Sequence, residues 1–351
     1  MPTPSGQISL DDVNTELDIA PGTQINMDAA DVRALAEVPT GAISMSDLQN
    51  KSNAQFIVAT GGTITTDGDF KVHTFNDSGT FVVNQAGNPA GSTSVDYLVL
   101  AGGGGGGQTN GGGGGAGGQL SSFPSPAVGG LPVTTTSYPV SVGAGGSKPS
   151  PGVNPGGNGS PSNFSTVNST GGGGGAKQAF PGNPGGSGGG AGASPNFAQP
   201  GGGGNSPAKS APATPVQGFP GGPNVIPSNY DRPGGGGGSS AAGTFGGTGS
   251  PSPQGAPGGA GRSDSITGSS VQRGGGGGGS SINAQQVHLL GNGGAGGGGQ
   301  GCISSNQYRS SSNGGTNQGG GGGGGNATSD GDGIGGKLGG KGVVIIRYKF
   351  Q

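Results

Sequence analysis

The sequence predicts a mainly irregular and β fold: short N-terminal helices, a small β-sheet, and a polyglycine-II helix bundle with long end loops. Of the 351 residues, 94 are glycine and 27 are proline, so these two types make up about a third of the chain. Runs of glycine recur over residues 102–341. An apolar, strand-like segment stands at each end of this field, S-V-D-Y-L-V-L-A at 94–101 and G-V-V-I-I-R-Y-K-F at 342–350. A disordered linker would not need these strands.

Residues 1–53 predict a small helical module. An Ile-centred motif recurs three times at spacings of 17 and 18 residues, beginning at Ile8, Ile25 and Ile43. Each copy is typical of a helix start, with Ser9 and Ser44 as capping-box residues and Asn26 as an N-cap. We expect helices at about 10–17, 27–36 and 45–49. Helices this short are not stable alone.

Two interpretations of the helical module stay open. It could dock the protein to a partner surface, or it could be a self-contained helical cap on the next domain. The docking interpretation assigns the contact to its apolar residues: Ile8, Leu10, Val13, Leu17, Ile25, Met27, Val32, Leu35, Ile43, Met45 and Leu48.

Residues 54–101 switch to strand chemistry. Four β-branched or aromatic segments, at about 55–60, 69–75, 79–84 and 94–101, predict strands. The turn N-D-S-G at 76–79 favours a tight hairpin. A further strand is expected at 137–142, where Pro139 suits an edge position. The closing segment, 342–351, is expected to pack with these strands.

The glycine field at 102–341 predicts a folded bundle. Glycine loses the most backbone freedom on folding, so long runs need a compensating gain. Polyproline-II-type helices provide one, because their N–H and C=O groups point outward and can bond laterally when no Cβ intervenes. The segments between runs would then form loops at the two ends. The alternative is a flexible glycine-rich linker, which would not need the aromatic residues of the intervening segments: Phe164, Phe180, Phe197, Phe219, Tyr230, Phe245 and Tyr308.

Composition argues against several function classes. A net charge of −2 leaves no electrostatic footprint for nucleic acid. No stretch reaches the roughly 18 apolar residues that span a bilayer, and no signal peptide is visible. The single cysteine and two scattered histidines predict no metal site, no Gly-rich phosphate loop ends in Lys-Ser or Lys-Thr, and no catalytic constellation can be assembled. We therefore expect a non-enzyme without cofactors.

Several motifs carry a resemblance to a known family. T-F-N-D-S-G-T-F-V-V-N, V-D-Y-L-V-L-A-G-G-G-G-G-G, Y-P-V-S-V-G-A-G-G and the closing G-V-V-I-I-R-Y-K-F are similar to the glycine-rich domain of bacteriophage tail proteins. The N-terminal S-G-Q-I-S-L-D-D-V-N-T-E-L resembles the start of many phage virion proteins. The resemblance implies a virion component located in the host cytoplasm during assembly. Related fibre-tip adhesins stack polyglycine-II helices and contact the host through end loops.

The leading functional expectation is therefore a tail-fibre or fibre-tip adhesin that binds a host surface glycan or outer-membrane protein. The helical module would bind other virion proteins, and a homo-oligomer is possible, although no heptad repeat supports one. The segment 205–233 supplies the candidate receptor-binding residues Phe219, Tyr230, Asp231 and Arg232, which mix stacking and charge. The alternative functions are a structural virion appendage without receptor binding and an ice-binding protein. The alternative role of the aromatic residues is only to cap the ends of the bundle.

Overall fold

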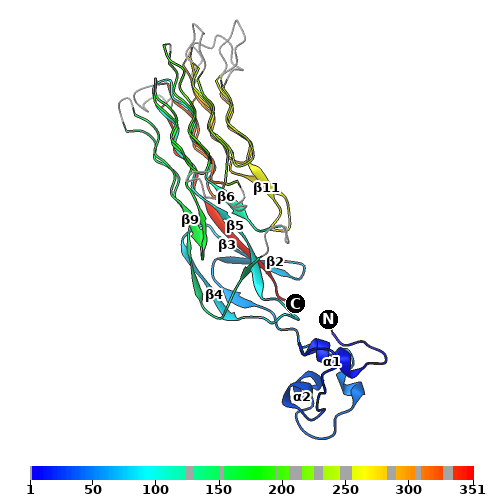
Figure 1. Cartoon of the computed structure of the whole chain (residues 1–351). Coiled ribbons are helices and arrows are strands. Elements are labelled where there is room, and N and C mark those ends of the chain that lie inside the picture. Colours follow the sequence, from blue (N-terminus) through cyan, green and yellow to red (C-terminus); the bar gives the residue numbers. More distant parts are fainter. Residues whose placement is uncertain are drawn as a thin grey trace.

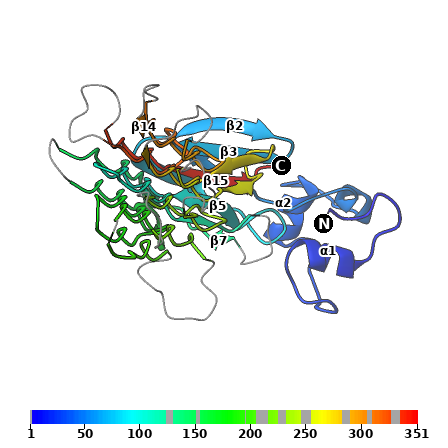
Figure 2. The same ribbon diagram turned by 90° about the horizontal axis from the view of Figure 1, so that it is seen from above.

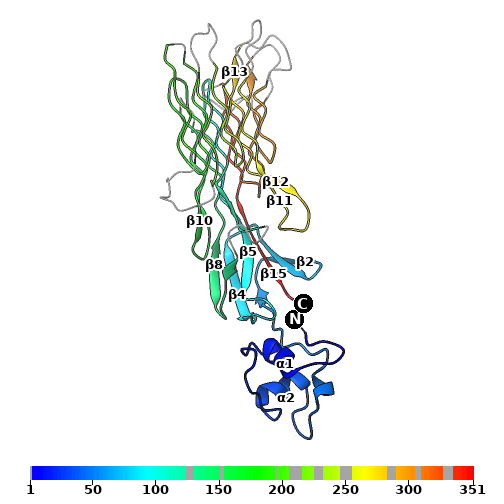
Figure 3. The same cartoon turned by 45° about the vertical axis from the view of Figure 1, so that its right-hand side comes forward.

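The chain forms an elongated molecule with three successive parts (Figure 1). A helical module lies at one end, two antiparallel sheets lie in the middle, and extended glycine-rich segments run side by side at the other end (Figure 3). This computed structural model describes residues 2–123, 130–150, 154–194, 196–204, 216–224, 232–245, 255–282, 290–304, 310–326 and 335–351. The mainly β and irregular fold class expected from the sequence is confirmed.

The helical module contains α1 (Leu10–Glu16), α2 (Ala30–Ala36) and the 3-10 helix η1 (Met45–Leu48). Both predicted capping boxes form, Ser9 with Asp12 and Ser44 with Asp47. The bond from Ser9 lowers the pKa of Asp12, because it stabilises the charged carboxylate. Asn26 is not the N-cap of α2, which begins three residues later than expected. Its Oδ1 instead accepts from the backbone N–H of Asp28 at 2.9 Å in a turn before the helix.

Two antiparallel sheets share one core. The five-stranded sheet has the order β1-β4-β8-β9-β10, with β1 Val58–Thr60, β4 Gly79–Gln85, β8 Ser137–Ser141, β9 Ser162–Phe164 and β10 Val167–Ser169. The six-stranded sheet has the order β2-β3-β15-β5-β6, with β7 also paired to β5 (Figure 2). Its strands are β2 Thr63–Asp67, β3 Phe70–Phe75, β15 Val343–Lys349, β5 Ser94–Leu100, β6 Gln119–Ser121 and β7 Leu131–Pro132. Side chains from both sheets, including Phe81, Phe164 and Tyr348, fill the space between them.

The closing strand β15 is central in the six-stranded sheet. Val344 lies opposite Val99 of β5 on one side and opposite Phe75 of β3 on the other. Strand β5 leads directly into the first glycine run, and β15 follows directly after the last one. The entry and exit of the glycine field are therefore held together by adjacent strands.

Three strand expectations need correction. The N-D-S-G turn does not make a hairpin, because β3 pairs with β2 and β15 whereas β4 pairs with β1 and β8. The turn instead carries the chain from one sheet to the other. Strand β8 is internal, but Pro139 faces only Thr80 of β4, since the pairing with β9 is restricted to Val140 and Ser141. Strand β2 was not expected.

The glycine segments are joined by backbone hydrogen bonds that rotate among three neighbours. Along 101–108, successive N–H groups donate in turn to the segments 112–118, 154–160 and 337–340, at 2.8–3.2 Å, and each partner recurs every third residue. Three further segments donate to this run, so it has six neighbours: 143–147, 171–176 and 319–325. The run 111–118 likewise exchanges backbone hydrogen bonds with six neighbouring segments. We refer to this network as the glycine lattice.

The glycine lattice leaves no room for a side chain at its centre. A Cβ atom built on Gly114 would lie 2.1 Å from the carbonyl oxygen of Gly104, and one built on Gly277 would lie 2.1 Å from that of Gly322. Such distances are far inside van der Waals contact. Cys302, expected in a loop, is buried within a lattice segment, and burial raises the pKa of its thiol to about 12. Its thiolate is therefore not available for chemistry near neutral pH.

A short hairpin fastens the glycine lattice to the six-stranded sheet. It consists of β11 (Arg262–Asp264) and β12 (Val271–Arg273), and the turn between them places Ile266 in the apolar cluster on the outer face of the sheet. Arg347 of β15 donates to the Ile266 carbonyl at 3.1 Å and to Asp67 at 2.7 Å. Further along, β13 (Ser281–Ile282) and β14 (Ile303–Ser304) pair in parallel inside the glycine lattice.

We expect Gly114→Ala to lower the free energy of unfolding by about 1–3 kcal/mol or more, because the added methyl group collides with a fixed backbone carbonyl. Gly203→Ala is the matched control: among the described residues other than Gly203 and its two chain neighbours, no heavy atom lies within 4 Å of the added Cβ position. That change should be neutral or stabilise the chain by about 0.4–1 kcal/mol through the unfolded state. Denaturant titration followed by circular dichroism measures both variants. Equal midpoints for the two would contradict the packed lattice.

Candidate functional site

The two ends of the elongated molecule are the candidate interaction surfaces, and the helical module forms one of them. Its short helices pack against each other around a core of Val13, Val32, Leu35, Ala36 and Leu48. Of the predicted docking residues, all except Leu10 belong to this cluster, either buried or packed against it. They therefore hold the module together. Leu10 is 45% exposed and stays available on the surface.

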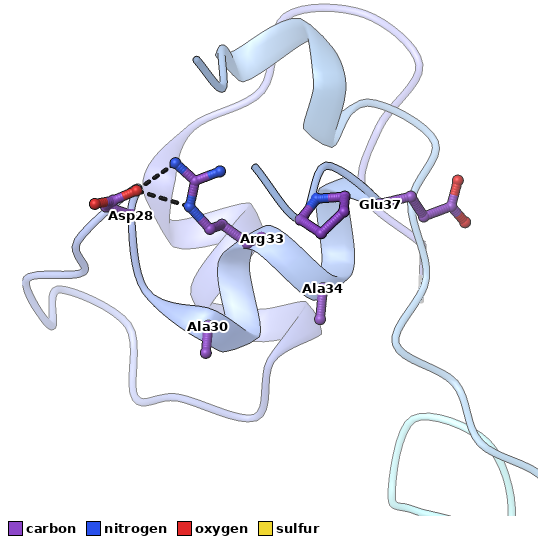
Figure 4. A pocket seen from close by; sticks show the side chains of 6 residues that line it. Asp28, Ala30, Arg33, Ala34 and Glu37 are labelled. Atoms are coloured by element: carbon purple, nitrogen blue, oxygen red, sulfur yellow. Dashed lines mark hydrogen bonds and ion pairs between the residues drawn. The ribbon is translucent and has the colours of Figure 1, made fainter. Parts of the chain in front are cut away.

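An open hollow lies on the outer side of α2 (Figure 4). Its volume is about 480 Å³, and its lining combines Ala30 and Ala34 on one helix face with Arg33, Asp28, Glu37 and Pro39. Arg33 is fixed there, because its Nε donates to Asp28 at 2.7 Å and its Nη1 donates to the Val38 carbonyl at 3.1 Å. The small side chains of Ala30 and Ala34 thus line one part of the hollow, and the fixed guanidinium group of Arg33 lines another. A hollow of this kind can accept a side chain from another surface.

The other end of the molecule exposes aromatic rings. Phe180 is 50% exposed and Phe197 is 64% exposed. Both follow glycine lattice segments that run away from the sheets. The segment around Phe180 is tied to its neighbour by two backbone bonds, from Ala179 to the Ala193 carbonyl at 2.8 Å and from Gly192 to the Phe180 carbonyl at 3.0 Å. The ammonium group of Lys177 lies 4.3 Å from the centre of the Phe180 ring.

Asn224 holds the segment that carries Phe197. Its side chain is buried, and its Nδ2 donates to the Phe197 carbonyl at 3.1 Å and to the Ser194 carbonyl at 3.4 Å. Its Oδ1 accepts from the backbone N–H of Gln199. One carboxamide thus fixes three backbone groups beside an exposed ring. Sequence reasoning missed Asn224, because an isolated asparagine after Gly-Gly-Pro gives no signal of the segment it will meet.

The predicted receptor-binding residues do not form a shared surface among the residues described. Phe219 is half-buried within the glycine lattice: its N–H donates to the Gly238 carbonyl and its carbonyl accepts from Gly188, both at 3.0 Å. Arg232 is only 6% exposed, and no described residue forms a hydrogen bond with its Nε or Nη1 atom. Tyr230 and Asp231 lie outside the described residues. Phe164, also expected in an end loop, lies in β9 and in the core between the sheets.

The chemistry of the described residues is that of recognition by hydrogen bonds and apolar contact. Over the described ranges, no group of three His, Cys, Asp or Glu side chains is placed to hold a metal ion. His73 is buried, with Nδ1 2.7 Å from the Gly61 carbonyl and Nε2 3.1 Å from the Tyr348 hydroxyl, and burial lowers its pKa. Its two nitrogens are thus used inside the core. Within the described part of the chain, no helix has the length and apolar character to cross a membrane.

Comparison with known proteins gives one match. A family model described as a glycine-rich domain matches residues 76–349, which include most of both sheets and the whole glycine lattice. No curated protein matches the chain.

Replacing Asn224 by alanine should release the segment that carries Phe197, because the Gln199 N–H and two carbonyls lose their partner. Leaving such buried groups unpaired costs about 1–3 kcal/mol. Hydrogen exchange should therefore speed up at Phe197 and Gln199. Asn196→Ala is the control, since Asn196 is exposed in the same segment and no hydrogen bond of its side chain is seen. Unchanged exchange in the Asn224 variant would show that other contacts fix the segment.

Proposed function

The chain belongs to the glycine-rich domain family, and we propose that it is a bacteriophage virion protein that serves as a tail fibre or fibre-tip adhesin. In this role it binds a molecule on the surface of the host bacterium, either a glycan or an outer-membrane protein. The helical module joins it to other virion proteins. The chain performs no catalysis in this role.

The observation that supports the adhesin role most strongly is that the two candidate interaction surfaces lie at opposite ends of the molecule. A helical module with a surface hollow lies at one end, and exposed Phe180 and Phe197 lie at the other. The glycine lattice separates the two ends and is built from backbone bonds that fix the position of every segment. A rigid spacer that carries aromatic rings away from a docking module suits a protein that must contact a distant surface.

The exposed aromatic groups favour receptor binding over a purely structural appendage. Aromatic side chains dominate interface energetics, and a protein without a partner gains nothing from exposing them at a fixed position. Phe180 is paired with a cation and Phe197 is held in place by a buried asparagine. The ring of Phe180 and the backbone of Phe197 are thus held before any partner arrives, which lowers the entropic cost of binding.

We also propose that the lattice segments adopt the polyglycine-II conformation. The support is the rotation of hydrogen-bond partners with a three-residue period, which is the period of polyproline-II-type helices. Far-ultraviolet circular dichroism of the full chain checks this proposal. A polyproline-II-type spectrum that disappears cooperatively on heating is expected. A spectrum of β-sheet type alone, or a gradual change without a transition, would count against it.

The adhesin role predicts that the purified full chain binds cells of the strain on which the phage propagates and competes with adsorption of the intact phage. The double variant Phe180→Ser with Phe197→Ser should bind more weakly, because both rings are removed from the exposed end. Leu338→Ser is a control at an exposed apolar residue of the glycine lattice. A chain that is folded but neither binds cells nor competes would support the structural appendage instead.

A further inference from the structure

A polar groove lies on the side of the glycine lattice, next to the five-stranded sheet. Its volume is about 520 Å³, which falls within the range of roughly 300–1,000 Å³ that ligand sites occupy. The hairpin of β9 and β10 forms one part of the lining, and three neighbouring lattice segments form the rest. The lining residues are Asn158, Gly159, Pro161, Asn163, Asn168, Ser169, Thr170, Gly171, Pro184 and Gly185.

Two asparagines reach the groove together because of the hairpin register. Asn163 of β9 lies directly opposite Asn168 of β10, so both side chains leave the same face of the hairpin. The alternate residues Ser162, Phe164 and Ser169 point to the buried face. The hairpin is thus anchored on one side and presents a pair of carboxamides on the other.

These carboxamides have no partner in the described part of the chain. No hydrogen bond joins the Asn163 or Asn168 side chain to another described residue, and Asn163 is half-buried whereas Asn168 is exposed. The Oδ1 of Asn158 accepts from the Gly174 N–H at 2.8 Å and from Asn183 Nδ2 at 3.1 Å, which orients its remaining donor group. Three amides around one groove offer several donors and acceptors at once.

Among the described residues, none in the lining of the groove is charged. These residues therefore offer no ion pair to phosphate, sulfate or carboxylate groups. Its other surfaces are the rings of Pro161 and Pro184 and the bare backbone of three glycines, which permits close approach. A ligand that fits must be neutral, rich in groups that both donate and accept, and partly apolar on its faces.

We propose that this groove binds a neutral oligosaccharide. Each sugar hydroxyl can donate and accept, as each carboxamide can, and the C–H faces of a sugar ring can lie on proline rings. An extended peptide would instead require side-chain pockets or a free strand edge. Strand β10 is the outer strand of its sheet but contains only three residues, and its Ser169 is buried against the Gly118 carbonyl. The observations therefore favour a sugar.

The inference deepens the proposed function and rests on it for the source of the sugar, the surface of the host bacterium. It places a glycan contact on the side of the lattice, separate from the aromatic end. None of the described lining residues has an aromatic ring, so we expect weak binding per site. Several copies of the chain on one particle would raise the overall avidity.

The test begins with a glycan array probed with the full chain. Hits are then titrated as free oligosaccharides by ligand-observed NMR. The double variant Asn163→Ala with Asn168→Ala should bind at least about tenfold more weakly, because four hydrogen-bonding groups are lost. A second double variant, Asn163→Asp with Asn168→Asp, keeps the size of both side chains and should also bind more weakly. Asn84→Ala, an exposed strand asparagine of the same sheet, should leave binding unchanged.

The outcomes test the groove proposal and the adhesin role separately. Absence of binding to every neutral glycan, selective binding of anionic glycans, or equal binding by the groove variants would overturn the groove proposal. Competition by an unrelated extended peptide at the same site would overturn it as well. If the folded groove variants lose oligosaccharide binding while the wild-type chain fails to bind host cells, the groove stands and the adhesin role fails. If wild type and groove variants bind cells equally and also bind oligosaccharides equally, the adhesin role stands and the groove fails.

Discussion

The lateral hydrogen bond between glycine backbones is the interaction on which the rest of this structure depends. In most domains an apolar core compensates for the entropy lost on folding. Here the two central runs each bond to six neighbours, and carbonyl oxygens lie where Cβ atoms would stand. Each N–H of these two runs finds a partner on another segment, so their bare backbone is buried without an unpaired donor. Glycine is required because a Cβ would separate the segments.

A lattice of this kind must be started and aligned by something else, since glycine runs carry no side chains that distinguish one register from another. The sheets supply that information. Strands β5 and β15 are adjacent, and their apolar residues face two separate clusters of buried side chains. A shift of one residue would move the side chains of each cluster to the other face of the sheet and break the packing of both clusters. The first and last runs are therefore set in register before any glycine contact is considered.

The same division explains where recognition can occur. The central glycines of the lattice cannot carry side chains. The side chains that do lie inside it, such as those of Ala116 and Cys302, are small and buried, so recognition is restricted to its ends and to its outer boundary. At the boundary, Asn158 takes the place of a missing neighbour by accepting the Gly174 N–H. There the β9–β10 hairpin and Pro184 can form a groove. At the far end, the buried carboxamide of Asn224 fixes the backbone beside an exposed ring. Polar side chains thus act where the backbone network stops.

The sequence by itself determined the local features: both capping boxes, the strands that bracket the glycine field, and the need for lateral bonding in a chain without Cβ atoms. Tertiary structure decided the features that depend on contacts between distant residues. It placed the N-D-S-G turn between the two sheets and made β8 an internal strand. It also placed most of the residues predicted to dock the protein in or against the core of the helical module. It also placed Phe219 and Arg232 apart and brought Asn163 together with Asn158. Because the glycine runs are alike in sequence, only the complete tertiary structure determines which segments lie next to each run.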